Sequence, residues 1–268
     1  MTINPDEYLR FTGQQVCDAD FSGRRLMQLA ATGSVFERCR FERMSVEAAS
    51  LGAGVAVSEF VDCSFDGSRM RMGGGFSRFV RCSFRNVRLG DWQGDYVELI
   101  DCVFTGRLRS SQFWGVPERM TATSRLASQT RWREKEGLEP PTAEMRALYL
   151  RGCNEFHGND FSGAELVDVS FRAGVDLSLQ RLPDGDDYLY VPDAAGAIDR
   201  AAAALARQPI DEDLRAEVDH FLRNTLARGV RQGQRQLLLR AEDFARRGAV
   251  PPHVTLALNL LRQASATP

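Results

Sequence analysis

The sequence reads FVDCSF at residues 60–65, FVRCSF at residues 79–84 and LIDCVF at residues 99–104. The same pattern, apolar-x-x-small-x-Phe, also occurs as VCDADF (16–21), FERCRF (36–41) and FHGNDF (156–161). The six copies end in Phe21, Phe41, Phe65, Phe84, Phe104 and Phe161, which are separated by 20, 24, 19, 20 and 57 residues. Internal repetition of this kind indicates a solenoid or another repeat architecture.

A shorter period of five residues lies within this repeat. Large apolar side chains recur at every fifth position, for example at Phe156, Phe161, Leu166 and Phe171. Neither an α-helix nor a single β-strand has this period. Four five-residue steps give the common spacing of 20, so successive copies are expected to lie one coil apart. The spacing of 24 predicts a four-residue bulge around residues 52–54, and the spacing of 57 predicts an insertion of 37 residues.

These features resemble the pentapeptide-repeat family, in which a small residue, an Asp or Asn and a Leu or Phe are followed by two free positions. The closest matches are Ala19-Asp20-Phe21, Asn159-Asp160-Phe161 and Ala164-Glu165-Leu166. The resemblance covers residues 11–114 and 153–182, about half of the chain. It implies a right-handed, quadrilateral parallel β-helix with Phe and Leu on its axis. Coils that are too short to bury a core alone would be stabilised by stacking on their neighbours.

The expected fold is mainly β with α, in two domains. A pentapeptide-repeat β-helix over residues 1–182 is interrupted by a helical insertion at 115–152, and a C-terminal helical module follows over residues 183–268. Helices of the module are expected at 193–207, 211–229, 231–247 and 252–263. In the insertion, Pro117 and Glu118 are expected to begin the first helix and Thr142 to cap the second.

Four of the six cysteines, Cys39, Cys63, Cys82 and Cys102, stand two residues before the last Phe of their copies. We expect them to point inward as a ladder of small apolar side chains. Positions one coil apart leave disulfide distances open. The sequence holds no CxxC pair and no Cys/His cluster, which disfavours zinc. Packed, reduced thiols are typical of a cytoplasmic protein, and no metal or cofactor is expected.

The insertion carries seven basic and five acidic residues, with Trp132 between Arg131 and Arg133. Trp and Arg are enriched at the hot spots of protein interfaces. One interpretation is therefore a partner-binding surface that includes Arg131, Trp132 and Arg133, and Trp114 is counted with them. The other interpretation is a helical hairpin that only packs against one face of the solenoid.

Charge is uneven in the C-terminal module. Residues 184–219 hold ten acidic and three basic residues, whereas residues 223–247 hold seven arginines and two acidic residues. One interpretation is a nucleic-acid-binding surface, made by Arg228, Arg231, Arg235 and Arg240. The other is that the acidic and basic helices pack together or are solvated. A homodimer formed through these helices is a further hypothesis.

Composition and motifs disfavour several function classes. The 34 basic and 36 acidic residues give a net charge of −2, which offers no overall attraction to nucleic acid or acidic membranes. The sequence contains no run of 18 apolar residues, which is the pattern expected of a membrane-spanning helix. His157 near Asp160 is more typical of a surface than of a catalytic dyad, and the loop with Asp184, Asp186 and Asp187 lacks the spacing of an EF-hand. With no catalytic constellation in the sequence, we expect a protein that is not an enzyme.

The expected function is a non-enzymatic protein-interaction scaffold in the cytoplasm. Understood members of the resembling family bind DNA gyrase or related type II topoisomerases as DNA mimics and protect them from antibiotics. The resemblance therefore implies such a partner. Residues 1–114 depart from this pattern, because 14 arginines balance 14 acidic residues. The alternative is a nucleic-acid-binding or regulatory protein that uses the arginine-rich C-terminal helices.

Overall fold

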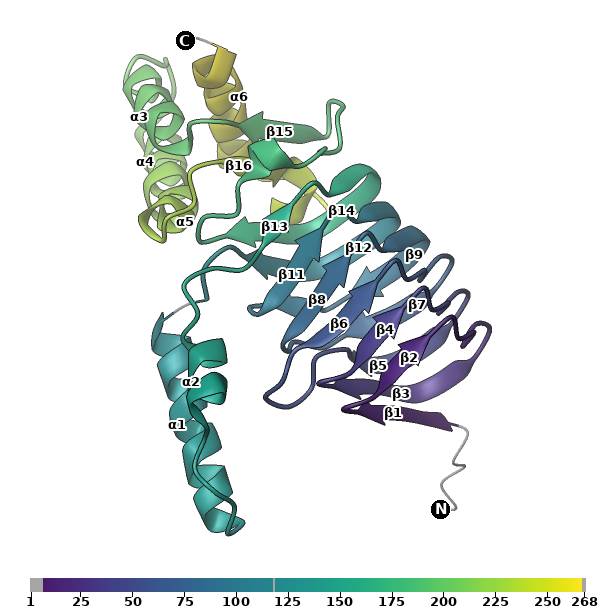
Figure 1. The fold of residues 1–268 in the computed structure, drawn as a ribbon. Coiled ribbons are helices and arrows are strands. Elements are labelled where there is room, and N and C mark those ends of the chain that lie inside the picture. The colour runs from purple at the N-terminus through teal and green to yellow at the C-terminus, as the bar shows by residue number, and fades with distance from the viewer. Residues whose placement is uncertain (1–6, 118, 267–268) are drawn as a thin grey trace.

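Parallel strands, stacked coil upon coil, form the body of the protein (Figure 1). The computed structural model describes residues 7–117 and 119–266. Residues 1–6 and 267–268, at the outer ends of the two expected domains, lie outside the described residues. So does Glu118, which was expected to begin the first helix of the insertion. Within the described residues, the predicted parallel β-solenoid with helices is confirmed.

The coils contribute to two parallel sheets. The first sheet contains β1(Tyr8–Thr12), β3(Arg25–Thr32), β5(Ser45–Ser50), β7(Arg69–Met72), β9(Ser83–Gly90), β12(Val103–Trp114) and β14(Asp160–Arg172), with β10(Gln93–Gly94) also paired to β12. The second contains β2(Gln15–Cys17), β4(Val35–Glu37), β6(Ser58–Val61), β8(Ser77–Val80), β11(Val97–Ile100) and β13(Phe156–His157). Strands from successive coils therefore lie side by side and in register.

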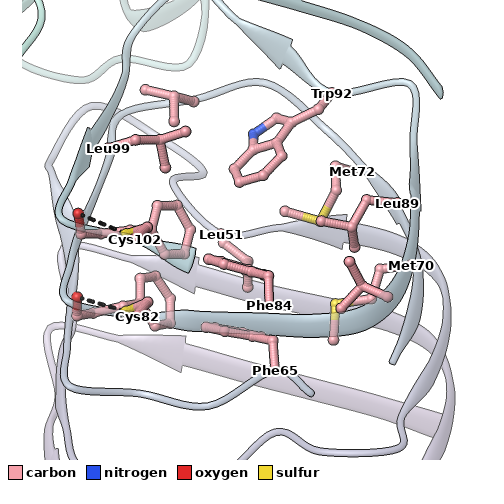
Figure 2. Close-up of a cluster of buried hydrophobic side chains, with 14 of the residues drawn as sticks. Leu51, Phe65, Met70, Met72, Cys82, Phe84, Leu89, Trp92, Leu99 and Cys102 are labelled. Carbon is pink, nitrogen blue, oxygen red and sulfur yellow. Dashed lines mark hydrogen bonds between the residues drawn. The ribbon is translucent and has the colours of Figure 1, made fainter. Parts of the chain in front are cut away.

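Phenylalanine rings fill the interior of the coils. The last Phe of each repeat copy stacks on the next, with ring centroids 4.6 to 5.0 Å apart from Phe21 to Phe161. Figure 2 shows Phe65 and Phe84 stacked in this column. All members of the column are fully buried except Phe21, which is partly buried. Such ring pairs stabilise by about 0.5–1.5 kcal/mol beyond the area that they bury.

The cysteine ladder lies inside the solenoid, as predicted. Cys39, Cys63, Cys82 and Cys102 are at most 1% exposed, and all four are free thiols. The Cys82 thiol donates to the carbonyl of Phe60 at 3.2 Å, and the other three thiols reach the preceding coil in the same way. Each cysteine thus adds a weak hydrogen bond between coils that an alanine would not make.

Asn159 occupies the ladder position in the coil that follows the insertion. Its amide nitrogen donates to the carbonyl of Leu99 at 2.8 Å, and its oxygen accepts from the amide of Cys102 at 3.0 Å. A second buried asparagine, Asn154, donates to the carbonyls of Trp114 at 2.6 Å and Asp95 at 2.9 Å. The two amides satisfy backbone groups where the chain leaves and re-enters the solenoid.

The irregular repeat spacings correspond to the predicted bulge and insertion. Ala49 pairs with Met72, and Ser58 pairs with Ser77. The chain takes nine residues to pass from Ala49 to Ser58, but only five to pass from Met72 to Ser77 on the next coil. The four extra residues therefore lie between Ala49 and Ser58. After the insertion, Leu99 pairs directly with Phe156, which confirms that the spacing of 57 is one coil plus an insertion.

One corner of each coil has a left-handed backbone that the sequence pattern did not reveal. Asp18, Arg38, Asp62, Arg81 and Asp101 have φ values between 51° and 55°. Gly158, with φ of 69°, holds the same place in the next coil, where a side chain would overlap with that of Asp101. Charges alternate along this corner, and Arg38 and Arg81 form bidentate pairs with Asp18 and Asp62 at 2.8 Å.

The C-terminal residues form a second apolar cluster. It is enclosed by β15(Tyr188–Val191), α3(Ala194–Leu205), α4(Glu212–His220), the π-helical η3(Phe221–Leu226), α5(Ala227–Arg231), β16(Leu237–Arg240), the 3-10 turn η4(Ala241–Phe244) and α6(Pro252–Ala266). Asp193 and Asp211 cap α3 and α4. The helix predicted at 231–247 is wrong, because residues 237–240 form β16, which pairs antiparallel with β15.

This C-terminal part also covers the end of the solenoid (Figure 1). Tyr188, Tyr190 and Leu238 pack against the solenoid core. Buried Gln234 accepts from the amide of Gly174 at 3.0 Å and donates to the carbonyl of Val175 at 2.9 Å. The short 3-10 turn η2(Leu177–Leu179) is held by Gln236, which accepts from the amide of Leu177. These hydrogen bonds satisfy backbone groups of the chain that follows β14.

The thiols provide a test of this packing. In the native protein, a thiol reagent should modify exposed Cys17 and Cys153 and leave the four ladder cysteines unreacted until the protein is denatured. Burial denies access to the reagent, and it also raises the pKa of the Cys39 and Cys82 thiols, which lowers their thiolate fraction at neutral pH. Mass spectrometry of the labelled protein measures this. Native labelling of all six cysteines at one rate would contradict the inward ladder.

Candidate binding surfaces

The insertion forms a helical hairpin that projects from the side of the solenoid (Figure 1). Its helices are α1(Arg119–Lys135) and α2(Ala143–Tyr149), and Thr142 caps α2 by accepting from the amide of Met145, as predicted. At the base, Ala122 and Tyr149 pack with Phe76 and Tyr96 of the solenoid. The hairpin is thus attached through its base, while α1 extends away from the strands.

Ionic contacts reinforce this attachment. The guanidinium carbons of Arg125 and Arg151 each lie 5.6 Å from the ring centroid of Tyr96, whose hydroxyl donates to the carbonyl of Tyr149 at 3.2 Å. Arg151 lies 3.5 Å from Glu98, and burial lowers the pKa of Arg151. Cation–π contacts at partly desolvated sites contribute about 1–2 kcal/mol each. The base of the hairpin is therefore held in one orientation.

Most of the exposed large apolar side chains in the described part of the chain lie on the hairpin or at its base. Within the described residues, the exposed large apolar side chains are Met27, Val116, Met120, Trp132, Leu138, Leu150 and Leu179. Five of these seven lie between residues 116 and 150. Val116 and Leu150 also line a hollow of about 350 Å³ at the hairpin base. Clustering of exposed apolar side chains is typical of interaction surfaces.

The four predicted partner-binding residues differ in their exposure to solvent. Arg131 and Trp132 are exposed on α1, and Trp132 is 50% exposed. Arg133 donates to the carbonyl of Glu139 and fastens the loop that follows α1. The prediction for Trp114 is corrected, because this side chain is only 9% exposed. Its ring centroid lies 5.5 Å from the guanidinium carbon of Arg172. A side chain buried in this way does not present a contact surface.

The arginines predicted for nucleic-acid binding are also divided. Arg228, Arg231 and Arg235 are exposed. The prediction for Arg240 is corrected, because its side chain is only 16% exposed. It lies within 4 Å of three carboxylates, those of Glu165, Glu242 and Asp243. It therefore joins the C-terminal part to β14 instead of facing solvent.

A basic surface that was not identified from the sequence lies on the outer side of the first sheet. Arg69, Arg88 and Arg107 occupy the same register position on β7, β9 and β12. Arg71 and Arg109 lie two residues further along the outer strands. The five arginines line an open groove of about 1050 Å³. The 19-residue spacing of Arg69, Arg88 and Arg107 was the available signal in the sequence.

The structure also places the histidine and carboxylates that the sequence offered as site candidates. His157 is exposed, and Asp160 accepts from Ser162, whose hydrogen bond lowers the pKa of that carboxyl. Among residues 7–117 and 119–266, no group of three or more His, Cys, Asp and Glu side chains is placed to hold a metal ion. In the same part of the chain, none of the helices combines the length and the apolar character needed to cross a membrane.

Comparisons of the chain with family models, curated proteins and solved structures find no match in any of the three. The resemblance to pentapeptide-repeat proteins therefore rests on the repeats within the sequence. The functional argument rests on the residues and geometry described above.

Tryptophan fluorescence tests the exposure of the hairpin. Trp92 and Trp114 are 1% and 9% exposed, so acrylamide should quench mainly Trp132. A Trp132→Phe variant should lose the quenchable fraction of the emission, and its thermal midpoint should remain unchanged, because exposed substitutions alter stability by about 0.5 kcal/mol or less. Equal quenching of the wild type and this variant would show that Trp132 is covered.

Proposed function

We propose that this protein is a non-enzymatic scaffold that binds a partner protein through its helical hairpin. One observation carries the proposal: the exposed apolar side chains of the described residues concentrate on this projecting segment. Met120 is 82% exposed and Trp132 is 50% exposed, although burial of such side chains is favourable. A partner that covers them would gain that free energy.

The attachment of the hairpin supports the same proposal. A surface that is already ordered loses less conformational entropy on binding than a flexible one. Tyr96, Arg125 and Arg151 hold the hairpin base against the solenoid. Trp and Arg, which dominate the energetics of many interfaces, stand side by side at Arg131 and Trp132.

The proposal also concerns the handedness and cross-section of the solenoid and its relation to the C-terminal helices. We infer that the solenoid is the right-handed, quadrilateral β-helix of the pentapeptide-repeat family, followed by a separate helical module. Burial at every fifth position, as at Phe36, Phe41, Val46 and Leu51, supports four sides to each coil. On this basis a type II topoisomerase such as DNA gyrase is the first partner to test. The basic groove is unlike the surface of duplex DNA, so we place the contact on the hairpin.

Paired substitutions test the proposal. A Met120→Ser/Trp132→Ser variant should lower affinity for the partner by at least about tenfold, because central interface anchors contribute about 2 kcal/mol or more. A Met27→Ser/Leu179→Ser variant is the matched control, since it removes exposed apolar side chains outside the hairpin. Immobilised proteins would be tested against purified gyrase, and captured lysate proteins would be quantified by mass spectrometry.

The outcomes separate the parts of the proposal. Loss of a captured partner only in the hairpin variant supports the hairpin surface. Loss only in the control variant contradicts it. Specific capture of a protein other than gyrase retains the scaffold and removes the topoisomerase. Thermal midpoints within a few degrees of the wild type would show that both variants remain folded.

A further inference from the structure

Like charges stand directly opposite one another on the outer face of the first sheet. Arg69 pairs in register with Arg88, and Arg88 pairs with Arg107. Neighbouring strands are about 4.8 Å apart, and like charges at such positions are destabilising. At the corner of the coils, by contrast, arginines face a carboxylate of the preceding coil, as Arg38 faces Asp18 and Arg81 faces Asp62. The arginine row therefore departs from the alternation of charge at that corner.

Within the described residues, three of the arginines on this face have no protein partner. Arg107 forms a bidentate pair with Glu165 at 2.7 and 3.0 Å, and Arg71 contacts Asp91 at 2.6 Å. Arg69, Arg88 and Arg109 are exposed, and within the described part of the chain their side chains make no ion pair or hydrogen bond. Their charge is available to a ligand.

Gly90 leaves the centre of the groove open. It lies in register between Arg71 and Arg109, where a longer side chain would fill the space between the two arginines. The fold does not require glycine here. A Cβ atom at this position would approach no atom closer than the carbonyl oxygen of Arg109, at 3.8 Å, which is an ordinary contact.

The chemistry of the groove favours an extended polyanion. Its arginines come from successive coils and do not converge on one point, which suits a chain of anions better than a single one. The apolar lining residues Val46, Met70, Val87 and Leu89 are buried, so they offer no anchor to a protein partner. Five arginines outnumber the three carboxylates of the lining, which are Glu47, Asp91 and Glu165. An excess of basic side chains on a polar surface is typical of nucleic-acid interfaces. Among residues 7–117 and 119–266, no aromatic side chain lines the groove for base stacking.

We propose that this arginine face binds the phosphodiester backbone of a nucleic acid without reading its bases. Guanidinium groups form strong hydrogen bonds with phosphate oxygens, and such contacts position a protein on nucleic acid independently of sequence. This ligand is additional to the partner protein proposed for the hairpin, and it contacts the first sheet of the solenoid instead. The three free guanidinium groups set the expected number of released counterions at about three.

Fluorescence anisotropy with a labelled DNA duplex of mixed sequence tests the proposal in the full-length protein. The logarithm of the binding constant should fall with the logarithm of salt concentration, with a slope of about −3. Arg88→Glu and Gly90→Glu should each lower the affinity on the order of tenfold and reduce the slope by one or more. Duplexes of unrelated sequence should bind equally.

Thermal stability distinguishes a binding role from a structural one. Each variant places a carboxylate between two arginines, which restores the alternation of charge seen at the coil corner. The thermal midpoints of Arg88→Glu and Gly90→Glu should therefore equal or exceed that of the wild type while DNA binding falls. A large decrease in the midpoint of Arg88→Glu would assign the arginine row a structural role and overturn the proposal.

Two controls complete the test. Arg207→Glu changes the net charge by the same amount as Arg88→Glu, at an exposed position beyond α3, and it should leave DNA affinity nearly unchanged. Arg228→Glu/Arg231→Glu alters the C-terminal arginines, and loss of binding in this variant but not in Arg88→Glu would overturn the proposed site. Absence of salt-dependent DNA binding by the wild type would overturn the ligand. Equal displacement of DNA by polyglutamate would indicate an acidic protein instead.

Discussion

The stacking of phenylalanine rings at strand spacing is the constraint on which the rest of the structure depends. Ring centroids in the column from Phe21 to Phe161 are 4.6 to 5.0 Å apart, which matches the distance of about 4.8 Å between hydrogen-bonded strands. Ring stacking and backbone pairing therefore favour the same register. A coil that slipped by one residue would lose both and would turn its apolar side chains toward water.

Fixed register also organises the surface, because an outward residue lies beside its counterpart in the next coil. Along the corner that begins at Asp18 the counterparts alternate in charge, whereas Arg69, Arg88 and Arg107 repeat one charge. Departures from the repeat serve a different purpose. The insertion carries the hairpin, and the C-terminal residues satisfy the last coil through Gln234. Regular coils thus provide the support, and the irregular segments carry most of the exposed large apolar side chains of the described residues.

Periodic features of the sequence predicted much of this structure. The Phe spacing predicted the stacked core and the insertion, the cysteine positions predicted the inward ladder, and Thr142 predicted a helix start. Tertiary contacts decided what periodicity could not. Residues 237–240 form a strand because they pair with β15, and Arg240 turns from solvent because three carboxylates surround it. Trp114 adjoins an insertion yet lies beneath Arg172, which local sequence does not reveal.

Equilibrium unfolding of Phe84→Ala and Arg85→Ala is the most direct measurement of the central constraint. Phe84 is fully buried between Phe65 and Phe104. Its neighbour Arg85 is exposed, and its guanidinium donates to the Ser83 hydroxyl at 2.7 Å and lies 3.7 Å from the Asp66 carboxylate. Phe84→Ala should lower the free energy of unfolding by about 3–5 kcal/mol, and Arg85→Ala should lower it by less than about 1 kcal/mol. Similar losses in the two variants would contradict the stacked column as the determinant of the fold.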